Sequence, residues 1–136
     1  MHDVSPKTQG VHHCGLTVPD LGAARTFFES ALGFRTVGEL PDYPAVFLSD
    51  GTVMLTLWQA ENRAAAAPFD RRRSVGLHHL ALRVAPGVLD ALHHDLAERT
   101  DVDVEFAPEP LQGGPTRHMM CAIPGGIRLE LIAPAQ

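Results

Sequence analysis

The chain has 136 residues, of which 45% are hydrophobic and 20% are charged, and its formal net charge is −5. This composition is that of one globular domain with a sizeable core. The acidic balance excludes the basic footprint of a nucleic-acid-binding protein, and no apolar run is long enough to cross a bilayer. The first ten residues lack the apolar stretch of a signal peptide, and two cysteines make no disulfide framework, so we expect a cytoplasmic protein.

Two stretches of eight residues resemble each other and identify an internal repeat. Val11–Val18 reads VHHCGLTV, and Leu77–Val84 reads LHHLALRV. The matched histidines His13 and His79 are separated by 79 − 13 = 66 residues, and the other matched positions share this offset. Self-similarity of this kind indicates one structural unit that is used twice.

Alternation within each stretch is typical of a β-strand, because successive side chains of a strand point to opposite faces. One face of each predicted strand is apolar and is expected to pack against a helix. The opposite face carries His13 in the first copy and His79 in the second, among small or polar neighbours. Two equivalent histidines on the open faces of two equivalent strands are candidates to converge.

The first copy continues with a predicted helix and three predicted strands. Asp20 is placed to cap a helix whose apolar positions run at helical spacing over Leu21–Leu32, and Gly33 is placed to end it. Turn residues, among them Asp50-Gly51, divide the segment that follows. The strands expected there are Phe34–Leu40, Tyr43–Ser49 and Thr52–Gln59.

An alanine-rich segment, Ala60–Ser74, joins the two copies. Its triplet Arg71-Arg72-Arg73 indicates a solvated linker or, alternatively, a positive edge that attracts an anionic substrate. The second copy repeats the element order of the first. Its elements are expected to be a strand at Gly76–Ala85, a helix that begins at Pro86 and includes Leu96, a strand at Val102–Phe106, a loop at Ala107–Pro115, and strands at Arg117–Ile123 and Ile127–Ala133.

Each copy has one helix and four strands, too few to bury both faces of its sheet, so the two copies must pair within the chain or across a dimer. The predicted fold is α+β and forms a single domain over residues 11–133. Its two paired βαβββ modules, 11–59 and 75–133 with the linker 60–74 between them, are expected to form a half-open barrel around a cavity.

A carboxylate on the last predicted strand completes a candidate metal site. Glu130 lies between two leucines that face the helix side, so it is placed on the cavity side, where a carboxylate is costly unless it is paired or binds a metal. His13, His79 and Glu130 form a two-histidine, one-carboxylate set, which suits a divalent transition metal and leaves positions open for water, substrate or dioxygen. The alternative is that Glu130 pairs with Arg128 or Arg117.

Thr56 occupies in the first module the place that Glu130 has in the second, and a neutral hydroxyl is a poor metal ligand. Three protein ligands are therefore expected. His118 is a candidate general acid or base, or else a solvated histidine at a loop end. Arg83 and Arg128 lie on predicted cavity faces, where either can orient an anionic substrate or pair with a nearby acid. The apolar side chains that could line the pocket, or belong to the core, are Phe47, Trp58, Met119 and Met120.

These motifs resemble the vicinal oxygen chelate superfamily, which includes glyoxalase I, extradiol dioxygenases, fosfomycin-resistance thiol transferases, methylmalonyl-CoA epimerase and bleomycin-binding proteins. The resemblance covers Val11–Ala133 and rests on VHHCGLTVPDL with ALGF, on LHHLALRV and on PGGIRLELI. It implies paired βαβββ units, frequently a homodimer, and a metal at the cavity floor with His13, His79 and Glu130 as its ligands.

The resemblance also separates activities within the superfamily. Glyoxalase I and methylmalonyl-CoA epimerase use a fourth ligand at the place of Thr56, so both are disfavoured. Extradiol dioxygenases and fosfomycin enzymes usually carry a tyrosine ten residues before the final glutamate, where 130 − 10 = 120 is Met120. The histidine of the dioxygenase signature and the lysine and serine of the fosfomycin enzymes are not evident either.

We therefore expect a metal-dependent enzyme that chelates a small oxygen-bearing organic substrate, as a lyase, isomerase or transferase. Iron, manganese, zinc, nickel or cobalt would act as the Lewis acid. The alternatives are an iron(II) extradiol-type dioxygenase and a drug- or small-molecule-binding resistance protein without turnover. The expected partners are a small molecule and a second copy of the chain, not nucleic acid or membrane. If the modules swap, His13 would come from one subunit and His79 with Glu130 from the other.

Overall fold

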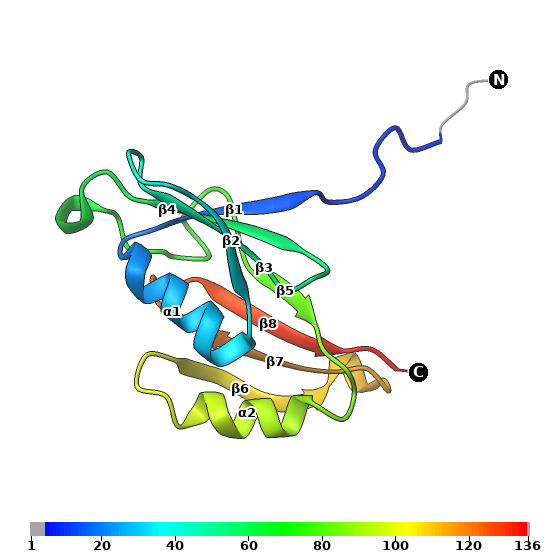
Figure 1. Cartoon of the computed structure of the whole chain (residues 1–136). Coiled ribbons are helices and arrows are strands. Elements are labelled where there is room, and N and C mark those ends of the chain that lie inside the picture. The colour runs from blue at the N-terminus through cyan, green and yellow to red at the C-terminus, as the bar shows by residue number, and fades with distance from the viewer. Residues whose placement is uncertain (1–4, 136) are drawn as a thin grey trace.

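The computed structural model of the chain describes residues 5–135 and folds them into two four-stranded sheets and two α-helices (Figure 1). Residues 1–4, within the segment that was read for a signal peptide, lie outside the described range. The first module consists of β1 (His13–Val18), α1 (Leu21–Leu32), β2 (Arg35–Leu40), β3 (Ala45–Ser49) and β4 (Met54–Gln59). The second consists of β5 (Leu80–Arg83), α2 (Leu89–Ala97), β6 (Asp103–Pro110), β7 (Arg117–Ala122) and β8 (Arg128–Ala133). The predicted α+β class and the two βαβββ modules are confirmed.

The two sheets have the same strand order, β1-β4-β3-β2 and β5-β8-β7-β6. In each sheet the first strand runs parallel to the last, and the register is equivalent: Gly15 lies opposite Thr56, and Ala81 lies opposite Glu130. The register therefore confirms that Thr56 and Glu130 hold the same place in the two modules. The sheets stay separate, so the arrangement is half-open rather than a closed barrel.

The first helix begins and ends where the sequence predicts. The Asp20 side chain accepts a hydrogen bond from the Ala23 N–H at 3.0 Å and caps the first turn. Gly33 follows the helix in the left-handed conformation, with φ 74°, and its N–H donates to the carbonyl of Phe28. None of the helices within residues 5–135 combines the length and the apolarity needed to span a membrane.

One hydrophobic core joins the two modules on the helix side of both sheets. Phe27 and Phe28 of α1 and Leu96 of α2 belong to the same buried cluster as the leucines of β4 and β8. The Arg99 guanidinium, just after α2, lies 5.5 Å from the centre of the Phe27 ring and connects the modules at the edge of this core. Because the shared core lies on the helix sides, the open faces of the two sheets turn away from it.

Strand β6 differs from its predicted span. It continues to Pro110, whereas the sequence predicts a loop from Ala107, so that boundary was wrong. The register with β7 shifts between Phe106 and Glu109, and β6 is an edge strand. Bulges and edge positions tolerate proline, because no ladder hydrogen bond is lost there. Three further boundaries differ: β5 spans only Leu80–Arg83, β3 begins at Ala45 because residues 41–44 form a turn, and α2 begins at Leu89 rather than Pro86 because residues 86–88 form a turn.

Candidate active site

Glu130 stands on the open face of the second sheet between two histidines. Its Oε2 lies 2.6 Å from His118 Nδ1, and its Oε1 lies 3.4 Å from His79 Nε2. The side chains of Glu130 and His118 are each only 12% exposed, so this contact is largely shielded from water. The hairpin of β7 and β8 holds His118 near Glu130, since His118 pairs with Ile132 in the register.

Neither Arg117 nor Arg128, the two arginines considered as alternative partners of Glu130, forms an ion pair with it. Arg117 donates two hydrogen bonds to Asp90, at 2.9 and 3.1 Å. Arg128 donates to Glu105 at 3.1 and 2.8 Å and is 11% exposed on its side chain. The carboxylate on the open face therefore has imidazoles, rather than guanidinium groups, as its neighbours.

His13 lies apart from this group within one chain. It stands on β1 of the first sheet, and its Nδ1 is 2.9 Å from Nδ1 of the neighbouring His12. No hydrogen bond or ion pair within residues 5–135 joins His13 to His79 or Glu130, and in that range no three His, Cys, Asp or Glu side chains are arranged to hold a metal ion. A single chain thus brings together two of the three predicted ligands and adds His118 beside them.

The chemistry of the donors nevertheless fits a divalent transition metal. An imidazole and a carboxylate, partly shielded on a rigid sheet, suit iron, manganese, cobalt, nickel and zinc alike. His118 at 2.6 Å from the carboxylate is placed as the outer partner that orients such a ligand. The set still needs a third donor from outside the His79–Glu130 pair.

Thr56 has a different role in the first sheet. Its side chain is buried, with 5% exposure of the residue, and its hydroxyl oxygen accepts a hydrogen bond from the Trp58 indole N–H at 2.8 Å. A Cβ at the opposite residue, Gly15, would lie only 3.1 Å from this oxygen. The position equivalent to Glu130 therefore anchors an aromatic ring, and a side chain at residue 15 would crowd the anchoring hydroxyl.

Three aromatic side chains gather around this anchor, and we call Tyr43, Phe47 and Trp58 the aromatic wall. The rings of Tyr43 and Trp58 are 4.7 Å apart at an interplanar angle of 81°, and those of Phe47 and Trp58 are 6.0 Å apart at 55°. Tyr43 is 62% exposed. The sequence indicated Phe47 and Trp58 as possible pocket residues but missed Tyr43, which lies in the turn before β3 rather than in a strand.

The remaining predicted pocket residues lie around Glu130. Met120 on β7 is directly opposite Glu130 in the register and is buried. Arg83 on β5 pairs with Ile132, is exposed, and makes no hydrogen bond or ion pair with residues 5–135. Arg128 pairs with Glu105, one of the two roles that the sequence left open for it. Arg83 thus remains as an exposed cation, without a partner among residues 5–135, on the same sheet as His79 and Glu130.

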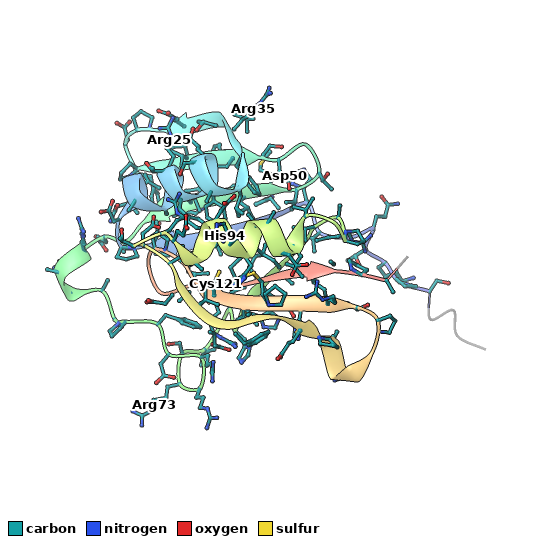
Figure 2. All side chains as sticks on the ribbon, turned by 90° about the horizontal axis from the view of Figure 1, so that it is seen from below. Arg25, Arg35, Asp50, Arg73, His94 and Cys121 are labelled. Atoms are coloured by element: carbon teal, nitrogen blue, oxygen red, sulfur yellow. The ribbon has the colours of Figure 1, made fainter. Side chains whose placement is uncertain are left out.

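The linker is tied to the second sheet through an acid. Arg71 donates to Glu105 at 2.7 Å, and Arg128 binds the same carboxylate. The hydrogen bonds from Arg128, and more weakly the charge of Arg71, hold the pKa of Glu105 below its ordinary value of 4.5. Arg73, by contrast, projects from the linker away from both helices (Figure 2). One arginine of the triplet is therefore structural, and the others face solvent.

A cavity of about 510 Å³ is lined by the predicted pocket residue Arg128 but by none of the predicted metal ligands. The linker covers it, with the edge strand β1 and the turn before β8 as its other walls. Most of the residues that line it are small or apolar, among them Val18, Pro19, Phe69, Val75 and Ile127. Because none of His13, His79 and Glu130 lines this space, we place the candidate chemistry on the open face of β8 instead.

The fold, the repeated register and the histidine–glutamate pair together define the class of protein. The family model of the Glyoxalase/Bleomycin resistance protein/Dioxygenase superfamily matches residues 10–131. The chain belongs to this superfamily, the vicinal oxygen chelate group that its motifs resemble.

Individual relatives add detail. The chain is 34% identical over 150 residues to a 2-epi-5-epi-valiolone epimerase of Actinomyces sp., a match that covers 93% of this chain and 80% of the relative. A structure from Bacillus halodurans, named as a candidate glyoxalase, is 28% identical with a TM-score of 0.75 and covers 93% and 97% of the two chains.

A further likeness concerns the fold alone. A variant of the fosfomycin resistance protein FosX from Listeria monocytogenes, in complex with Mn(II) and 1S,2S-dihydroxypropylphosphonic acid, is 16% identical to this chain. Its TM-score is 0.71, and the match covers 94% of this chain and 92% of that one.

Proposed function

We propose that the protein is an epimerase that uses a divalent metal ion as a Lewis acid on a small hydroxylated ketone. The observation that carries this proposal is the His79–Glu130 pair, whose carboxylate is only 12% exposed and has His118 at 2.6 Å. The relative at 34% identity supports the reaction type, because it is named as an epimerase and the suffix of its substrate denotes a ketone.

The third ligand in this proposal is His13 of a second copy of the chain. Two observations support that assignment: His13 has no contact with the His79–Glu130 pair within one chain, and the open faces of both sheets turn away from the shared core. In a homodimer with exchanged modules, the open face of one subunit's first sheet would meet the open face of the other subunit's second sheet. His13 would then join His79 and Glu130.

The chemistry divides between the metal and the side chains. A bound divalent ion would withdraw electron density from the ketone and stabilise the negative charge that develops when the neighbouring carbon loses its proton. In this proposal His118 moves that proton. If its Nδ1–H donates to Glu130, its Nε2 carries the free lone pair of a general base. Epimerisation is completed when a solvent water molecule delivers a proton to the other face of the same carbon and His118 releases its proton to solvent, so that no net proton is gained or lost.

The direct test follows proton exchange in heavy water. With Mn(II) added, the protein should replace the proton next to the carbonyl of 2-epi-5-epi-valiolone by deuterium, as seen by NMR. Elemental analysis of the same preparation should show bound metal. A protein that binds Mn(II) but exchanges no proton would overturn the epimerase proposal and leave a binding protein, while one that binds no divalent metal would overturn the Lewis-acid proposal as a whole.

A further inference from the structure

The open faces of the two sheets differ in chemistry at equivalent places. On the second sheet, Glu130 has His118 and His79 around it. On the first, Thr56 has Trp58 and Phe47 around it, since Phe47 lies opposite Thr56 in the register of β3 and β4. Around these two equivalent positions, the module thus carries ionisable groups in one copy and an apolar aromatic surface in the other.

The aromatic wall has a polar anchor at Trp58, and Gly38 leaves space for the ring of Phe47. The indole N–H of Trp58 is already used by the Thr56 hydroxyl at 2.8 Å, so the exposed part of the ring offers carbon rather than a hydrogen-bond donor. A Cβ at Gly15 would lie 3.5 Å from Trp58 Nε1, and one at Gly38 would lie 2.9 Å from Phe47 Cδ2. A side chain at Gly38 would therefore collide with the Phe47 ring unless that ring moved, whereas a Cβ at Gly15 would make an ordinary van der Waals contact with Trp58.

We infer that the aromatic wall stacks against the ring of a cyclic substrate, so that the protein selects cyclic over open-chain hydroxy ketones. This inference rests on the proposed function, in which the open face of the first sheet borders the metal site. Tyr43 and Trp58 meet at 81° and form a corner whose surfaces match the flat C–H face and the edge of a six-membered ring.

The chemistry of the corner favours a ring over a flexible chain. Contact between aromatic surfaces and the apolar C–H groups of a substrate ring is favourable. The hydroxyl groups at the edge of that substrate ring can at the same time reach the polar side chains of the other sheet. An open-chain ketone with the same oxygen atoms offers less flat surface. It also loses more rotational freedom when it binds, which lowers its affinity.

Trp58 provides the measurement, because it is the only tryptophan of the chain. The fluorescence of the Mn(II)-loaded protein is titrated with 2-hydroxycyclohexanone and, separately, with the open-chain hydroxy ketone acetoin. We expect a saturable change with the cyclic ketone and an affinity for acetoin that is about tenfold weaker. Equal affinities for the two ketones would overturn the inference.

Three variants separate stacking from a merely structural role. Tyr43→Ala should weaken the binding of 2-hydroxycyclohexanone by about tenfold, whereas Tyr43→Phe should retain it because the ring remains. Val37→Ala removes another exposed apolar side chain, 57% exposed on β2, and should change nothing. If Val37→Ala weakens binding as much as Tyr43→Ala does, or if Tyr43→Ala alters only the oligomeric state in size-exclusion chromatography, the wall is not a ligand surface.

NMR of the same samples keeps the two proposals distinguishable. Selective binding of the cyclic ketone without deuterium exchange on either ketone would overturn the epimerase proposal and leave the stacking inference standing. Deuterium exchange at equal rates on both ketones, together with equal binding affinities for them, would overturn the stacking inference and leave the epimerase proposal standing.

Discussion

Glu130 and Thr56 occupy the same register position in the two copies of one module, Glu130 opposite Ala81 and Thr56 opposite Gly15. Each is the side chain around which its open face is arranged. Glu130 contacts two imidazoles, and Thr56 accepts the hydrogen bond of an indole. The same backbone site therefore supports ion chemistry in one sheet and an apolar surface in the other.

Replacement of Glu130 by Gln should abolish stable metal binding. The amide keeps the shape of the side chain but removes the charge, and we expect the affinity for Mn(II) to fall by more than the roughly 10–100-fold that loss of an outer partner costs. Calorimetric titration with Mn(II) measures the change. Glu109→Gln is the matched control, because Glu109 lies 3.9 Å from His118 on the same face and is 55% exposed. An unchanged affinity in Glu130→Gln would remove Glu130 from the ligand set.

Replacement of His118 by Asn should weaken metal binding and slow proton exchange together. His118 holds Glu130 at 2.6 Å, so its loss frees the carboxylate to rotate, and we expect a roughly 10–100-fold weaker affinity for Mn(II). His94→Asn, on the solvent side of α2, is the control and should bind metal like the original protein. A variant that binds Mn(II) normally but exchanges no proton would assign His118 to proton transfer alone.

Mixing two inactive variants tests the exchange of modules between subunits. His13→Ala and Glu130→Ala should each be inactive, but a mixed dimer contains one site with neither substitution. After unfolding and refolding of an equal mixture, we expect about a quarter of the original activity, because half of the dimers are mixed and each has one intact site of two. Sites built within one chain would recover no activity from the same mixture.

Cys121 should be inert in the folded protein. Burial raises the pKa of its thiol to about 11, from an ordinary value of 9.0. At mildly alkaline pH a thiol reagent should therefore modify Cys14, which is partly exposed, and should reach Cys121 only after denaturation. The same shift predicts that stability falls from about pH 9 upward, because the unfolded chain loses this proton more readily than the folded one. Modification of both thiols at equal rates in the native protein would contradict this.

Replacement of Arg128 by Leu should destabilise the second module. Glu105 is 36% exposed, so solvent screening limits the loss to roughly 1 kcal/mol of unfolding free energy. The pKa of Glu105 is lowered in the folded state, so this stabilisation is present above its ordinary value of 4.5 and is lost as the pH falls through the folded value. Urea unfolding at neutral and acidic pH should show a smaller pH effect in the variant. Arg73→Leu, whose side chain is 89% exposed, is the control.

Alternation and the offset of 66 residues predicted the module order, because both are local properties of the chain. The end of β6 was missed because an edge strand with a bulge tolerates prolines that read as a loop. The His118–Glu130 contact depends on the register of the β7–β8 hairpin, which could not be predicted from the sequence. Tyr43 was missed because it lies in a turn, and only the folded structure brings its ring into contact with Trp58. The distance between His13 and Glu130 depends on which faces of the two modules pack together. The sequence could not predict that packing, because the strands of the two copies carry similar residue patterns.

The aromatic wall and the Glu130–His118 contact belong to different sheets, and the two sheets share no strand. Substitutions confined to the open face of one sheet therefore need not alter the hydrogen bonds on the open face of the other. Natural selection, or an engineer, can therefore change the substrate specificity of such a protein while keeping the Glu130–His118 contact. A library confined to the turn at residues 41–44 and to the open-face positions Phe47, Thr56 and Trp58 would vary the aromatic wall, while the core-facing leucines of β3 and β4 and the second module stay unchanged.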